Sequence, residues 1–112
     1  MECNYSGKKN PTYFKIGDSY VSAKNLRLRI DSMIKQDQVN AANKLLDSLL
    51  HSHPQNGFLY YEIGYIKTTN RKFTIAIDDF KLAKEYNYSK RKCDDMIFVN
   101  QGMIEVDGLR HK

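Results

Sequence analysis

The strongest constraint on the fold is an internal repeat with a period of 34 residues. When the sequence is shifted by that length, five positions of one copy fall without a gap on small or apolar positions of the next. The coinciding pairs are Leu26 with Tyr60, Val39 with Phe73, Ala42 with Ala76, Leu46 with Phe80 and Leu49 with Ala83. A fixed period of this length restricts a chain to stacked copies of one supersecondary unit, because each copy buries its apolar face against its neighbours.

Within each copy the apolar residues recur at steps of three and four, which places them on one face of a helix. Five such rows begin near Ala23, Val39, Gly57, Phe73 and Cys93. Polar or helix-breaking residues separate consecutive rows, and Asp107-Gly108 is expected to end the last one. No segment alternates with a period of two beside a hairpin turn, the pattern typical of paired strands. The sequence therefore predicts an all-α fold of five antiparallel helices joined by tight turns.

Residues 1–18 are predicted to form a weakly ordered N-terminal arm, and residues 19–112 a helical repeat domain. Two clusters of turn-forming residues, at 6–11 and 17–19, account for the prediction of an arm. Between them Tyr13, Phe14 and Ile16 form an apolar patch that is too short to classify. We expect this patch to lie in a loop against the first helix.

Three elements of the chain have the spacing of a known repeat: Tyr60-x2-Ile63-Gly64, then Ala76-x3-Phe80, and Pro54 at the end of the first copy. In these elements the chain resembles the tetratricopeptide repeat (TPR) family. The resemblance implies repeats at about residues 23–56 and 57–90 and a partial third at about 91–106, stacked as a short right-handed superhelix. The small Gly64 and Ala76 are expected where two helices approach closely, with Phe80 filling the space beside them.

The resemblance also implies a concave groove, lined by the first helix of each pair, that receives a peptide segment or a partner helix. The corresponding positions are Lys24, Arg27, Leu28, Asp31, Lys35, Phe58, Tyr61, Glu62, Tyr65 and Thr69. Tyr61 and Tyr65 are four residues apart, so we expect their rings to stack along the groove. One subset of the family clamps a C-terminal carboxylate, but Asp31 and Glu62 would repel such a ligand.

Two classes of function remain open. The first is a protein-interaction module, an adaptor or chaperone-like TPR protein whose partner is another protein. The second is a helical nucleic-acid-associated protein, because the net charge is +5 and residues 81–92 hold five basic side chains and one acid. These basic residues are Lys81, Lys84, Lys90, Arg91 and Lys92. No RNA-binding or recognition-helix signature accompanies them, which favours the first class.

Enzymatic, metal and membrane functions find no support in the sequence. His51 and His53 are two residues apart, so on a regular helix they cannot bind one metal ion together. Cys3 and Cys93 lack a neighbouring catalytic or metal-binding motif, and no phosphate-binding or nucleophile motif occurs. No apolar run is long enough to cross a bilayer. We therefore predict a soluble, cytoplasmic, reduced protein that is not an enzyme and uses neither cofactor nor metal.

The terminal segment predicts a further contact. Its apolar residues would leave one side uncovered, because the chain offers no second helix to complete a third pair. These residues are Met96, Ile97, Val99, Met103 and Ile104. A homodimer through this helix is the favoured interpretation. A continuation of the repeat, or the patch at residues 13–16 folding back, would also cover this face.

Overall fold

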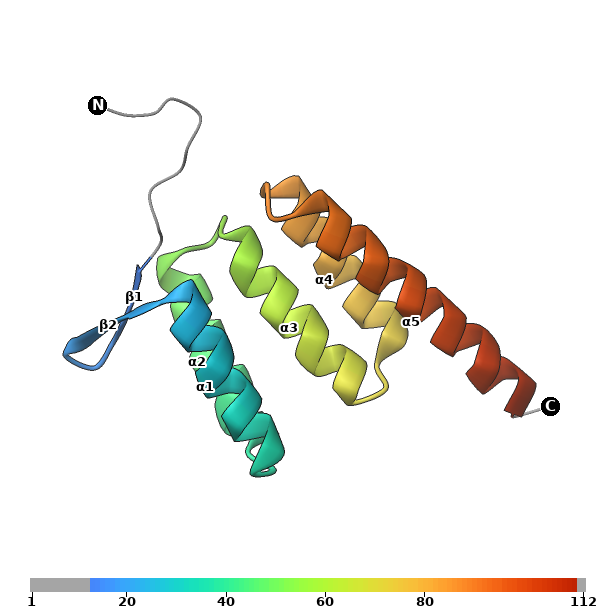
Figure 1. Ribbon diagram of the computed structural model, residues 1–112, viewed down its shortest axis with the longest axis horizontal. Helices are drawn as coiled ribbons and strands as arrows, with labels where there is room; N and C mark the ends of the chain where they lie inside the picture. Colours follow the sequence, from blue (N-terminus) through green and yellow to red (C-terminus); the bar gives the residue numbers. More distant parts are fainter. Residues whose placement is uncertain (1–12, 111–112) are drawn as a thin grey trace.

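The computed structural model describes residues 13–110, which form a β-hairpin followed by five helices (Figure 1). The elements are β1 Tyr13–Ile16, β2 Ser19–Ser22, α1 Ala23–Lys35, α2 Val39–Ser52, α3 Gly57–Thr69, α4 Phe73–Glu85 and α5 Lys90–Arg110. The helices follow one another along the long axis, from α1 and α2 at one end through α3 to α4 and α5 at the other, and the molecule measures 58 × 31 × 20 Å. The helical class predicted from periodicity is confirmed for residues 23–110 apart from the turns.

The 34-residue period of the sequence recurs in the ends of the helices. α1 and α3 begin 34 residues apart, and so do α2 and α4. The Ser22 hydroxyl accepts the N–H of Asn25 at 3.2 Å, and the Asn56 side-chain oxygen accepts the N–H of Leu59 at 3.1 Å. Equivalent polar side chains therefore cap the N-termini of α1 and α3, where backbone N–H groups have no partner within the helix.

The turns that follow α1, α3 and α4 are also alike. Each contains a residue with left-handed backbone: Asp37, Arg71 and Asn87 have φ of 60°, 63° and 67°. In each turn the next residue donates its N–H to the carbonyl five residues earlier, at 2.8 Å in the first turn and 2.9 Å in the other two. This closure satisfies the last carbonyl groups of a helix and reverses the chain direction. The repeat is therefore present in backbone geometry as well as in the apolar pattern.

The second helix pair packs more closely than the first. A methyl group added to Gly64 would lie 2.9 Å from two ring carbons of Phe80, so the absence of a side chain lets α3 approach α4. Ile30 stands 34 residues before Gly64, and α1 and α2 are accordingly in looser contact than α3 and α4. The expected close approach at Gly64 is confirmed, with Phe80 fully buried beside it.

The prediction for the N-terminal arm is wrong at residues 13–18. Strands β1 and β2 pair antiparallel around Gly17, with Phe14 opposite Val21. Phe14 is fully buried, its ring stacked at 6.0 Å from that of Phe58 and edge-on at 5.2 Å from that of His53. The hairpin therefore closes the end of the helical core rather than forming a loop. The rest of the predicted arm, residues 1–12 with Cys3, lies outside the described residues.

Helix α5 extends beyond the predicted 91–106 and continues past Gly102 and Asp107-Gly108. Its first turn is capped by the Ser89 hydroxyl, which accepts the N–H of Lys92 at 3.2 Å. The buried Asn100 side chain donates to the hydroxyl of Thr68 at 3.0 Å, and Asp107 pairs with Arg71. These polar contacts hold α5 against the α3–α4 pair well beyond its first turns.

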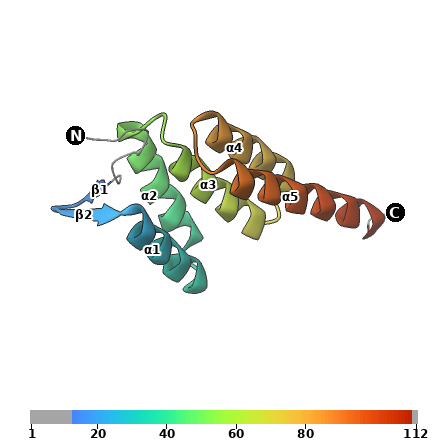
Figure 2. The same cartoon turned by 45° about the horizontal axis from the view of Figure 1, so that its top comes forward.

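Helix α5 runs beyond its neighbours, as Figures 1 and 2 show, and several of its apolar side chains are exposed. Phe98 and Leu109 are 77% and 70% exposed, and Val99, Ile104 and Val106 are also exposed. Met96 and Ile97, by contrast, pack on the α4–α5 core, so this part of the predicted uncovered face is wrong. The homodimer through α5 stays a prediction. Among the described helices, none is long and apolar enough to cross a membrane.

Candidate functional site

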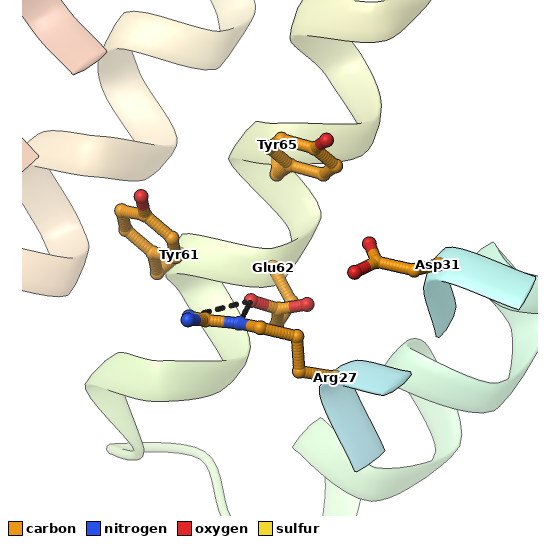
Figure 3. A pocket seen from close by; sticks show the side chains of 5 residues that line it. All are labelled: Arg27, Asp31, Tyr61, Glu62 and Tyr65. Atoms are coloured by element: carbon orange, nitrogen blue, oxygen red, sulfur yellow. Dashed lines mark hydrogen bonds and ion pairs between the residues drawn. The ribbon is translucent and has the colours of Figure 1, made fainter. Parts of the chain in front are cut away.

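A pocket of about 150 Å³ lies between α1 and α3, the first helices of the two pairs (Figure 3). Its lining consists of five of the residues predicted for the groove: Arg27, Asp31, Tyr61, Glu62 and Tyr65. Arg27 and Asp31 are one turn apart on α1, and the other three occupy consecutive turns of α3. Helical spacing thus presents charged and aromatic side chains from both helices to one space.

Arg27 organises one wall of the pocket. Its Nε and Nη2 both lie 3.1 Å from Oε2 of Glu62, and Nη2 also donates to the Tyr88 hydroxyl at 3.0 Å. The guanidinium carbon lies 5.5 Å from the ring centroids of both Phe58 and Tyr61, within the range of cation–π attraction. Burial alone would lower the pKa of Arg27, but the Glu62 carboxylate and Tyr88 hydroxyl outweigh it and raise that pKa. The guanidinium is therefore permanently charged and fixed in place.

Glu62 is the buried charge of the site, with only 2% of its surface exposed. Burial raises the pKa of its carboxyl group, while Arg27 opposes that rise and Asp31 adds to it; Lys92 opposes it more weakly. Oxygen Oε2 is satisfied by Arg27, but Oε1 is buried without a hydrogen-bond partner in the described part of the chain. An acceptor left unsatisfied in this way costs about 1–3 kcal/mol.

The opposite wall consists of Asp31 and Tyr65. Asp31 is half-buried and forms no ion pair with any described residue, and Tyr65 is 36% exposed. In Figure 3 the carboxylate of Asp31 projects from α1 toward α3, and the second oxygen of Glu62 is on the side that faces it. The charged atoms left open in this pocket are thus carboxylate oxygens, beside the exposed side chain of Tyr65.

The expected stacking of Tyr61 on Tyr65 is wrong. Within residues 13–110 the Tyr61 ring contacts the rings of Phe80 at 5.2 Å and Tyr88 at 4.9 Å, so it faces α4 and the turn after it. The ring of Phe58 likewise packs inward, on Phe14 and Tyr88. The rings of Phe58 and Tyr61 therefore pack against the Arg27 guanidinium. Tyr65 is the aromatic side chain of the pocket that remains exposed to a ligand.

The remaining predicted groove residues do not line the pocket. Lys24, Leu28 and Lys35 are exposed on α1. Thr69 is exposed near the end of α3, where its hydroxyl donates to the carbonyl of Ile66 at 2.7 Å. Five of the ten residues predicted for the groove therefore line one pocket, and these four lie outside it.

Tyr88 contacts the pocket residue Arg27 but is not among the residues predicted for the groove. It lies 61 residues from Arg27, yet its hydroxyl accepts from that guanidinium. Tyr88 follows α4, and its Cβ atom would lie 2.9 Å from a Cβ atom added to Gly57. Only glycine therefore fits at the start of α3. No local pattern in the sequence connects these three residues, because the contact depends on how the second pair closes.

The predicted basic cluster is partly neutralised. Lys84 and Lys90 both donate to the carboxylate of Asp94, at 2.6 and 3.0 Å, and these bonds lower the pKa of that carboxyl group. Lys92 lies 5.9 Å from the ring centroid of Tyr88. Lys81 and Arg91 are exposed. Three of the five basic residues therefore contact Asp94 or the ring of Tyr88.

Other parts of the described chain offer less chemistry. A larger hollow of about 300 Å³ runs along His53–Asn56 in the α2–α3 loop, but no Lys, Arg, Asp or Glu lines it. Among residues 13–110 no group of three His, Cys, Asp or Glu side chains is placed to hold a metal ion. Comparison of the chain with protein-family models, curated proteins and solved structures finds no match. Evidence for a function therefore comes from the pocket and the repeat themselves.

Proposed function

We propose that the chain is a TPR-type helical repeat and acts as a protein-interaction module, binding a peptide segment or partner helix of another protein along α1 and α3. Its fold class is supported by the 34-residue period, which extends from the apolar positions to the helix starts, the N-terminal caps and the left-handed turn residues. Paired-helix repeats of this kind present the first helix of each pair on a shared binding face.

One observation carries the proposal: equivalent helices of the two pairs contribute charged and aromatic side chains to a single pocket. A tyrosine ring exposed beside fixed polar groups is typical of protein interfaces, because it combines apolar area with a hydrogen-bonding tip. The Arg27–Glu62–Tyr88 network holds this surface in one conformation, which reduces the entropy lost on binding.

The nucleic-acid alternative has weaker support. Two of the five basic residues are paired with Asp94, and the acidic Asp31 and Glu62 on the α1–α3 side would repel phosphate. Nucleic-acid binding is therefore an alternative result of the experiment below and not the proposed function.

The test is selection of binders from a random peptide library on the immobilised chain, followed by affinity measurement in solution. Peptides that occupy the α1–α3 face should bind Tyr65→Ala about tenfold more weakly, since truncation of an interface tyrosine commonly costs more than about 1 kcal/mol. Ile75→Ala is the matched control, because Ile75 is an exposed apolar residue of α4 outside the pocket. Circular dichroism should show both variants as helical as the parent chain.

Two results would contradict the proposal. One is a library that yields no specific binder. The other is a set of binders equally insensitive to Tyr65→Ala and Ile75→Ala. Binding of a duplex or single-stranded oligonucleotide that falls steeply with salt and is lost on reversing the charges of Lys81 and Arg91 would favour the nucleic-acid class instead.

A further inference from the structure

We propose that the pocket between Asp31, Glu62 and Tyr65 binds a cationic side-chain head group of the partner, a lysine ammonium or an arginine guanidinium. This inference rests on the proposed function, which it deepens by naming the chemistry that is recognised. The pocket volume of about 150 Å³ suits one head group with its adjoining methylene groups rather than a larger ligand.

The charged atoms left open in the pocket are acceptors. Arg27, the one basic residue that lines the pocket in the described chain, already donates to Glu62 and Tyr88. The charged groups without a described partner are the Asp31 carboxylate and Oε1 of Glu62, and both are acceptors when ionised. The two carboxylates would repel an anionic ligand, whereas a cation would find charge-assisted bonds there.

Glu62 is almost completely buried. Its side chain is 98% removed from water, and its Oε1 atom is buried without a hydrogen-bond partner among the described residues. Figure 3 shows this oxygen on the side that faces Asp31. Two carboxylates face one guanidinium, so the pocket lining carries one uncompensated negative charge. An incoming cation meets Asp31 first and reaches Oε1 as the side chains of Asp31 and Tyr65 shift. It would neutralise the charge and satisfy the buried acceptor.

An aromatic ring, that of Tyr65, also lines the pocket. Tyr65 is partly exposed and stands one turn from Tyr61 on α3, on the pocket side. The methylene stem of a lysine or arginine packs favourably against such a ring, and the head group gains cation–π attraction. Acidic and aromatic groups therefore favour the same class of ligand.

The experiment is a titration of the full chain followed by amide NMR, with Nα-acetyl-lysine methylamide and Nα-acetyl-arginine methylamide as separate probes. Nα-acetyl-norleucine methylamide, which lacks the charge, is the control ligand. We expect saturable shifts of α1 and α3 amides around Asp31 and Tyr65 with one or both cationic probes and none with norleucine. The comparison of the two cations shows which head group is preferred.

Asp31→Asn is the diagnostic variant, because it removes the charge at a partly exposed position and keeps the shape. It should weaken probe binding about tenfold, as expected for the loss of a charge-assisted bond. Asp47→Asn, which removes an exposed carboxylate of α2, should leave binding unchanged. Equal binding of norleucine, or unchanged binding to Asp31→Asn, would overturn the inference.

The outcomes separate this inference from the proposed function. Library peptides that depend on Tyr65 but contain no lysine or arginine would leave the interaction module standing and refute the cation site. Binding of the cationic probes together with a library that yields no binder would support the site and refute the peptide-binding module.

Discussion

Replacing Gly64 by alanine tests the helix contact on which the second pair depends. In an exposed helix interior, alanine is more stable than glycine by about 0.5–1 kcal/mol, because glycine loses more backbone entropy on folding. At Gly64 the new methyl group would lie 2.9 Å from Cε1 and Cζ of Phe80. The ring cannot move freely, since Phe80 is fully buried and packed on Tyr61. Overpacking of this kind costs about 1–3 kcal/mol.

Gly102→Ala provides the matched control within the same chain. Gly102 is also inside a helix, but a methyl group there would meet no atom within 4 Å. We expect Gly102→Ala to raise the free energy of unfolding by about 0.5–1 kcal/mol. The difference between the two variants isolates the steric cost at the α3–α4 contact, about 1–3 kcal/mol, because the change in glycine entropy is common to both.

Urea unfolding followed by circular dichroism measures both variants, with equal m-values required for the comparison. A second readout is the double variant Gly64→Ala/Phe80→Leu, in which the smaller side chain makes room for the methyl group. The coupling energy of that pair should be favourable by about 1 kcal/mol. If Gly64→Ala stabilises the chain as much as Gly102→Ala, the close approach of α3 to α4 is refuted.

Three further predictions concern other parts of the molecule. Phe14→Ala should lower the free energy of unfolding, measured by chemical denaturation, by about 3–5 kcal/mol. Tyr13→Ala, at an exposed strand position, should change it by less than about 0.5 kcal/mol. Equal effects of the two substitutions would contradict the packed hairpin. Burial raises the pKa of Asp79 to about 6, so its carboxyl group binds a proton more readily when folded, and stability falls as pH rises from about 4 through 6. Asp79→Asn should remove that loss and stabilise the chain by about 1 kcal/mol at pH 7, a value discounted for partial exposure; pH-dependent melting curves that stay unchanged would refute it. If the exposed face of α5 forms the predicted homodimer, light scattering at micromolar concentration should give a dimer mass for the parent chain and a monomer mass for Phe98→Glu.

The local pattern of the sequence was sufficient to predict the helical part of the fold. Apolar positions at steps of three and four located all five helices of the described chain, and the 34-residue shift matched α1 with α3 and α2 with α4. Gly64 was also found from sequence, because its spacing from Ala76 and Phe80 identified a helix contact. These features are local or periodic, so neighbouring residues along the chain contain the signal.

The hairpin and the pocket depend on tertiary structure. Strands of four residues are too short to show alternation, and Phe14 is identified as core only once Phe58 and His53 surround it. The outer positions of α3 were predicted as one groove, yet Tyr61 turns toward α4 while Tyr65 stays exposed.

Helical spacing determined which side chains share a face of α1 or α3, and the resemblance to the TPR family implied that Arg27, Asp31 and Glu62 line one groove. It could not determine that Glu62 would be buried or that Arg27 would bind Tyr88, because the two partners of Arg27 lie 35 and 61 residues away in the chain. Burial and charge pairing are set by the distance between helices once they have packed, and that distance depends on glycine contacts and ring positions in the whole core.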